Sequence, residues 1–311
     1  MALGDIPAEL RPHVALIKHL INSFARHIGG RPHGACDRLH LQEIIERLQE
    51  LSLRVTSLPL ADAVRMRLDM LRTLAREIET FEKPSPAEYA AHLAARANQQ
   101  FTLFKRLVVG RTLVRPALVA RIAANLETVE RELEAIPSAS IPNPDYHATN
   151  LKLVKRELAK VVEVRDNPER ELPAAERARL LATAAMAERE DYRTSFAGRD
   201  RATVDLDRLG QICDRLGEIA FQVVALPPEV AGELTQQLAE NLDAYEVEFN
   251  LCADHRKRFI TLSHVVRSAD SLRAQLLAAD APEAVRKQAV ASLDALLADT
   301  LVREVTGTPS N

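Results

Sequence analysis

The chain has 311 residues, of which 47% are hydrophobic, and 41 basic against 44 acidic side chains give it a net charge of −3. This balance provides no general attraction to nucleic acid or anionic membranes, and with no Trp and only 4% aromatic residues there is little material for base stacking. No stretch approaches the ~20 apolar residues of a membrane helix, and three scattered cysteines indicate a reducing, cytoplasmic location.

The N-terminal residues predict an amphipathic helix over 7–28 and no secretory signal, because Asp5 interrupts the start of the chain. Apolar residues recur at intervals of three and four there, and again over 41–58, 122–136 and 209–226. A period near 3.5 residues places one narrow apolar seam on each helix, which favours bundles of long, nearly antiparallel helices. Since β-type alternation is missing, we expect an all-α fold of about eleven helices of roughly 20–25 residues, with a turn between two helices at Cys252.

Five of the nine histidines lie in the first forty residues, and some of them suggest a metal site. Cys36 and His40 stand four residues apart, on one face of a helix that begins near Cys36, and His33 can fold in from the preceding loop. Thiolate and imidazole are ligands that zinc prefers. No second ligand pair completes a tetrahedral set, so surface histidines beside a buried thiol are the main interpretation. Zinc is the one cofactor that the sequence suggests.

Regularly spaced prolines mark the starts of predicted helices. Five of them follow one another at nearly equal intervals: Pro59, Pro116, Pro173, Pro227 and Pro282. Proline is favoured at the first helical position, where its missing N–H has no intrahelical partner to lose. The spacing predicts helical-hairpin repeats of about 56 residues.

Aligning the chain with itself, so that Arg47 is matched to Arg215, reveals a second regularity. Several apolar seam positions match, as do three features that a shared period does not explain. These are an arginine, a glutamate and a Leu-Pro pair: Arg47, Glu50 and Leu58-Pro59 in the first half, Arg215, Glu218 and Leu226-Pro227 in the second. The match predicts an internally duplicated unit of five helices, with the two copies joined by a linking helix.

The expected domains follow from this duplication. The stretch 136–145 contains three prolines, and such backbone cannot continue a helix. We therefore expect an N-terminal helical bundle at 1–140, a Pro-rich linker and bridging helix at 141–168, and a C-terminal helical bundle related to the first at 169–311.

Familiar catalytic motifs are missing from the chain. It has no glycine-rich nucleotide loop, no serine-nucleophile elbow, no HExxH zinc motif and no DDxxD element. This absence favours a non-enzymatic role. The leading expectation is a cytoplasmic scaffold or adaptor that binds protein partners through a helix face or through the groove between its halves, and self-association is compatible with it.

Two alternatives stay open. A duplicated bundle creates a cleft between its halves, and such clefts are common ligand sites. Arg47 and Arg215 would then hold a small anion and make the chain a regulatory protein, although both can also be surface residues paired with nearby glutamates. The second alternative is a metal-binding protein that uses His33, Cys36 and His40.

Overall fold

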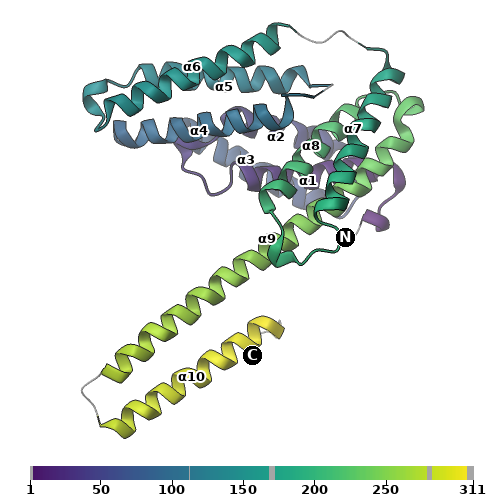
Figure 1. Cartoon of the computed structure of the whole chain (residues 1–311). Helices are drawn as coiled ribbons and strands as arrows, with labels where there is room; N and C mark the ends of the chain where they lie inside the picture. Colours follow the sequence, from purple (N-terminus) through teal and green to yellow (C-terminus); the bar gives the residue numbers. More distant parts are fainter. Residues whose placement is uncertain (1–2, 112, 168–171, 279–281, 307–311) are drawn as a thin grey trace. The chain divides into compact units, whose positions relative to one another are not determined.

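The computed structural model describes residues 3–111, 113–167, 172–278 and 282–306, and these ranges contain helices and turns but no strand (Figure 1). The predicted all-α class is therefore confirmed. The α-helices of the described ranges are α1 (Arg11–His27), α2 (Arg38–Arg54), α3 (Ala61–Thr80), α4 (Pro86–Leu107), α5 (Pro116–Glu134), α6 (Pro144–Asp166), α7 (Ala174–Ser195), α8 (Leu206–Val224), α9 (Pro228–Ala278) and α10 (Glu283–Thr306). None of these helices combines the length and the apolar character that crossing a membrane requires.

The regularly spaced prolines do mark helix starts. Pro116 is the first residue of α5, and the others lie one or two residues before α3, α7, α9 and α10. Each proline stands where the helical amides have no partner within the helix, so its missing N–H removes no hydrogen bond.

The expectation of about eleven helices of similar length is wrong in one place. No turn occurs at Cys252, because this residue lies inside α9, which is 51 residues long. In the first half, Pro84 and Pro86 separate α3 from α4. No proline follows Pro228 until Pro282, so nothing removes the helical hydrogen bonds near Cys252.

The chain folds into two compact units, which we describe separately. Unit 1 comprises residues 1–197 and 207–247, and unit 2 comprises 198–206 and 248–311. The first part of α9, up to Val247, belongs to unit 1 and the rest to unit 2. The division predicted from the duplication, with boundaries near 140 and 168, stays a prediction.

In unit 1, α4, α5 and α6 form a three-helix layer with a continuous apolar core, while α2 packs against α1 and α3 (Figure 1). Leu93 of α4, Ile122 and Leu126 of α5, and Val161 of α6 are fully buried. The seam between α4 and α5 is thus covered by a third helix, as the 3.5-residue period favours.

Three helices of unit 1 end in the same way. Near the end of each, the carbonyl of an aromatic residue accepts hydrogen bonds from the amides four and five residues later, at 2.8–3.3 Å. A glycine with φ of 72–73° follows. The aromatic residues and glycines are Phe24 and Gly30 after α1, Phe104 and Gly110 after α4, and Tyr192 and Gly198 after α7. Glycine adopts this left-handed conformation without steric cost.

Gly110→Ala is expected to lower the free energy of unfolding by about 1 kcal/mol, because an L side chain is disfavoured at φ +72°. No atom lies within 4 Å of the added Cβ, so the cost comes from the backbone alone. Gly110→Asn should cost less, since asparagine tolerates this conformation. Urea unfolding of both variants measures the difference, and an alanine variant as stable as the parent would contradict the assignment.

Unit 2 contains the second part of α9 beside α10. Arg273 of α9 pairs with Asp294 of α10, and Arg286 Nη1 donates to the carbonyl of Leu277 at 2.9 Å. At the other end of the unit, Arg201 Nε donates to Glu248 Oε1 at 2.9 Å. The two helices therefore form a hairpin, which we call the α9–α10 hairpin (residues 248–278 and 283–306).

Candidate functional site

A cluster of charges around Arg26 lies buried inside unit 1. Arg26, in the last turn of α1, places Nη1 2.6 Å from Glu246 of α9 and Nη2 2.9 Å from Asp214 of α8. Two histidines of α1 contact the same carboxylates: His19 Nδ1 lies 2.7 Å from Glu246 Oε1, and His27 Nε2 lies 2.9 Å from Asp214 Oδ2. This Arg26 cluster ties α1, α8 and the first part of α9 together.

The arginine keeps both carboxylates ionised despite their burial. Burial alone would raise the pKa of Asp214, but Arg26 and His27 outweigh it and hold the pKa well below its usual range. The pKa of Glu246 is lowered in the same way, against burial, by Arg26 and His19. A buried carboxylate without such partners would destabilise the fold.

A second cluster forms around Asp37, which is fully buried at the N-cap of α2. Its carboxylate accepts hydrogen bonds from the amide of His40 at 2.8 Å, from Gln100 of α4 at 2.8 Å and from Asn125 of α5 at 2.6 Å. Burial favours the neutral acid, yet Arg121, whose Nη1 is 3.7 Å away, and the hydrogen bond from the His40 amide lower the pKa of Asp37. Asp37 therefore joins α2 to α4 and α5.

Arg115, at the N-cap of α5, links the two halves of the chain. Its Nε and Nη2 donate to the two oxygens of Glu218 on α8, each at 2.8 Å, and its Nη1 donates to Glu43 of α2 at 2.6 Å. A bidentate arginine–carboxylate pair fixes geometry as well as charge. Arg121 Nε lies 3.1 Å from the other oxygen of Glu43.

The two arginines proposed from the sequence both lie at cavities, but at different ones. Arg47 donates from Nε to Glu43 at 2.9 Å and stacks its guanidinium 4.0 Å over the centre of the Phe221 ring. Arg215 Nη2 lies 2.6 Å from Glu188 Oε2 and 3.3 Å from Asp191 Oδ2. Both arginines pair with carboxylates, and neither is a solvated surface residue.

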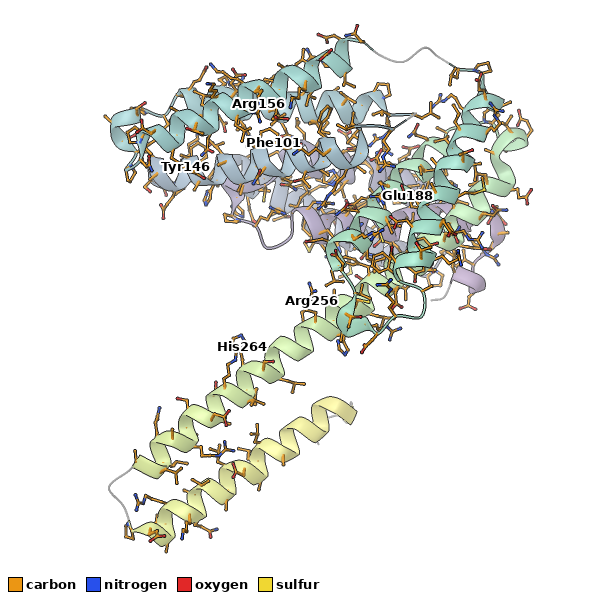
Figure 2. All side chains as sticks on the ribbon, in the orientation of Figure 1. Phe101, Tyr146, Arg156, Glu188, Arg256 and His264 are labelled. Carbon is orange, nitrogen blue, oxygen red and sulfur yellow. The ribbon has the colours of Figure 1, made fainter. Side chains whose placement is uncertain are left out.

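Arg115 and Glu218 line two cavities. The α5–α8 cavity has a polar wall of Arg111, Arg115, Glu188, Arg215 and Glu218. The volume of this cavity is about 60 Å³, which is several times the roughly 10–15 Å³ that one water molecule needs. Glu188, which lines this cavity, is labelled on α7 in Figure 2.

The second cavity, which we call the histidine cavity, is smaller, at about 30 Å³. His19, His27 and His40 line it together with Arg47 and Arg121. Burial and then the charge of Arg121 lower the pKa of His40 to about 4, so this imidazole is neutral at pH 7.

The residues of the predicted zinc site make separate contacts. His33 lies edge-on to Phe81, the Cys36 thiol points at the carbonyl of Pro32 at 3.5 Å, and His40 Nε2 is 3.1 Å from Ser23 Oγ. Within the described ranges, no group of three His, Cys, Asp or Glu side chains could hold a metal ion. The structure gives the zinc hypothesis no support.

Burial raises the pKa of all three cysteine thiols, to about 11 at Cys252 and well above the usual value at Cys213. Thiols in such surroundings stay protonated at neutral pH and are poor nucleophiles. All three cysteines are free and buried.

Sequence reasoning missed most of the buried charges. Asp37 carried a signal, because an aspartate directly before a helical pattern is a typical N-cap. Arg26, Arg115 and Asp214 carried none, since a charged residue on a helix looks the same in sequence whether it faces water or another helix.

No protein-family model, no curated protein and no solved structure matches the chain. The buried clusters, the two cavities and the exposed hairpin are therefore the basis for inferring its function.

Proposed function

We propose that the protein is a non-enzymatic, cytoplasmic helical scaffold that binds a partner protein through the α9–α10 hairpin. The apolar residues of this hairpin are unusually exposed, with exposed fractions of 45% at Leu272, 52% at Leu277, 57% at Val285 and 64% at Leu296. Among the described side chains of 262–298, Ala269 is the one that is buried. Two helices alone cannot enclose the apolar seam that they present.

The contrast with α4 and α5 supports a helix as the bound element. That pair is covered by α6, and Leu93 of α4, Ile122 of α5 and Val161 of α6 are all at 0% exposure. The α9–α10 hairpin has no third helix against it among the described residues of unit 2. An amphipathic helix of a partner protein, laid into the seam with apolar residues at intervals of three and four, would complete a comparable bundle.

Replacing Leu272 and Leu277 with Glu is expected to abolish partner binding, because two charges would enter the apolar contact. A photo-reactive residue at position 285, introduced in cells that express the chain, should crosslink to an amphipathic helix of one partner, and the double substitution should remove that crosslink. Met66→Glu in α3, an even more exposed apolar position of unit 1, is the control and should leave the crosslink intact.

Light scattering provides the second readout for this proposal. A monomer whose position 285 crosslinks to a partner helix supports it. A dimer that crosslinks only to its own α9 or α10 would show that the hairpin binds a second copy of the chain and no partner protein. A monomer without any crosslink would contradict the scaffold proposal.

A regulatory protein that binds a small anion is the second candidate, favoured by the α5–α8 cavity. Its polar wall combines Arg111 and Arg115 from the first predicted half with Glu188 and Arg215 from the second. Of the two arginines proposed from the sequence, Arg215 lies at the larger cavity. A thermal-shift screen over nucleotides, phosphates and carboxylates tests this candidate, and it fails if no compound raises the melting temperature.

We also infer that the chain arose by internal duplication, in the register that matches Arg47 to Arg215. Several boundaries support this: α2 begins at Arg38 and α8 at Leu206, while the short 3-10 turns His33–Ala35 and Arg201–Thr203 precede them. The glycines that end α1 and α7, Gly30 and Gly198, stand in the same register.

A further inference from the structure

The α5–α8 cavity has donors available on its charged side. Arg215 uses Nη2 for Glu188 and Asp191, whereas its buried Nε has no hydrogen-bond partner. Arg111 Nη1 donates to Glu188 at 3.2 Å from the other direction. A guanidinium carries five N–H donors in a planar fork that fits a carboxylate. Glu188 and Asp191 both contact Nη2, so the guanidinium of Arg215 keeps N–H donors at Nη1 for an acceptor placed in the cavity.

The charges of the wall favour one negative group in the ligand. Three guanidinium groups and two carboxylates line the cavity: Arg111, Arg115, Arg215, Glu188 and Glu218. Both carboxylates already accept hydrogen bonds from arginines, and the second oxygen of Glu188, Oε2, lies 2.6 Å from Arg215 Nη2. One anionic group would balance the lining.

Most of the other lining residues are apolar, and the volume of the cavity limits the size of the ligand. The apolar residues include Leu107, Leu118, Leu180, Leu181 and Ile219. A cavity of about 60 Å³ holds about four to six water molecules, or a ligand of a similar number of heavy atoms.

We propose that the α5–α8 cavity binds a short aliphatic monocarboxylate of about two to four carbon atoms, with its carboxylate on Arg215 and its alkyl chain against Leu118 and Leu181. This inference rests on the second candidate function, and it names the ligand class. Inorganic phosphate would leave the space beside the leucines unfilled, an alkylammonium would face three guanidinium groups, and a dicarboxylate would place a second charge against apolar side chains.

Binding would also have a structural consequence, because the ligand carboxylate would share the Arg215 guanidinium with Glu188. Glu188 lies on α7, Arg215 on α8, and Arg111 follows α4. Occupancy therefore changes the contact between α7 and α8, which is how a ligand in this cavity would act on the rest of unit 1.

The test uses butyrate as the ligand, and its binding to the full chain is monitored by two-dimensional NMR at fixed pH and ionic strength. Butyrate should perturb the amides of 180–188 and 215–222 and bind at least tenfold more tightly than 1-butanol, butylammonium or phosphate. Arg215→Gln should weaken butyrate binding at least tenfold, because a charge-assisted fork is lost. Arg47→Gln, the matched arginine at the histidine cavity, should change the affinity less than twofold.

Ala184→Leu is a second variant that keeps the test decisive if Arg215→Gln does not fold, because the added side chain fills the cavity and should block butyrate. Equal binding of 1-butanol and butyrate would overturn the proposal. If phosphate or succinate binds more tightly and Arg215→Gln removes that binding, the anion-binding function stands and the monocarboxylate assignment fails. If no anion perturbs these amides, both fail.

Discussion

Arg26→Leu is expected to lower the free energy of unfolding by about 3–5 kcal/mol, because it leaves two buried carboxylates without their cation. Asp214 and Glu246 are both inside unit 1, and Arg26 contacts them at 2.6–2.9 Å. Leucine is close in volume to the buried part of the arginine, so the loss measures the uncompensated charges more than a cavity. Urea unfolding at pH 7 gives the value.

The pH dependence of stability should change sign in this variant. In the parent protein the pKa values of Asp214 and Glu246 are lower in the folded state than in the unfolded state, where they are near 4. The ionised carboxylates therefore stabilise the fold above about pH 4, and this contribution is lost as the pH falls from there through the folded-state pKa values. Without Arg26, burial dominates and raises both pKa values above the unfolded ones. The variant should therefore gain stability relative to the parent as the pH falls from 7 to 5.

Two further variants separate the buried charges from a general loss of packing. Arg193→Ala removes an exposed pair with Glu190 and should leave the unfolding midpoint unchanged. Combining Arg26→Leu with Asp214→Asn and Glu246→Gln should recover part of the loss, because the uncompensated charges are then gone. If Arg26→Leu is as mild as Arg193→Ala, the cluster does not carry the stability assigned to it.

The apolar seams were predictable because they depend on local spacing alone. Leu41, Ile44 and Leu48 recur at three and four residues, and each is at most 1% exposed in the structure. Helix starts were predictable for a similar local reason, since proline restricts its own backbone. The missing turn at Cys252 shows the limit of this local reasoning, because no proline like Pro84 or Pro86 lies near Cys252 to end the helix.

The buried charges were not predictable, because their meaning depends on partners far away in the chain. Arg26 and Asp214 are 188 residues apart, and Arg115 and Glu218 are 103 apart. Charge runs on helices are normally solvated, so their burial is visible only when the helices are packed. The self-match aligned Glu218 and Arg215 with Glu50 and Arg47, which pointed to the right surface of α8 but not to Arg26 or Asp37.

Gly217→Ala is expected to lower the free energy of unfolding by about 2 kcal/mol, which is the cost of overpacking a filled interior. Gly217 lies on α8 directly against the His19 ring of α1, and an added Cβ would stand 2.1 Å from Nε2 of that ring. The ring cannot move freely, because its Nδ1 is held 2.7 Å from Glu246. In an open helical position the same change is favourable by roughly 0.5–1 kcal/mol.

Gly232→Ala is the matched control, because Gly232 is exposed on α9 and no atom lies within 4 Å of its added Cβ. It should be stabilising by up to about 1 kcal/mol. A double-mutant cycle with His19→Ala then locates the clash. Once the ring is removed, Gly217→Ala should no longer destabilise and should approach the effect seen at Gly232, since only helix propensity remains. A loss of the same size with and without His19 would show that the close approach of α1 and α8 at this glycine is not the cause.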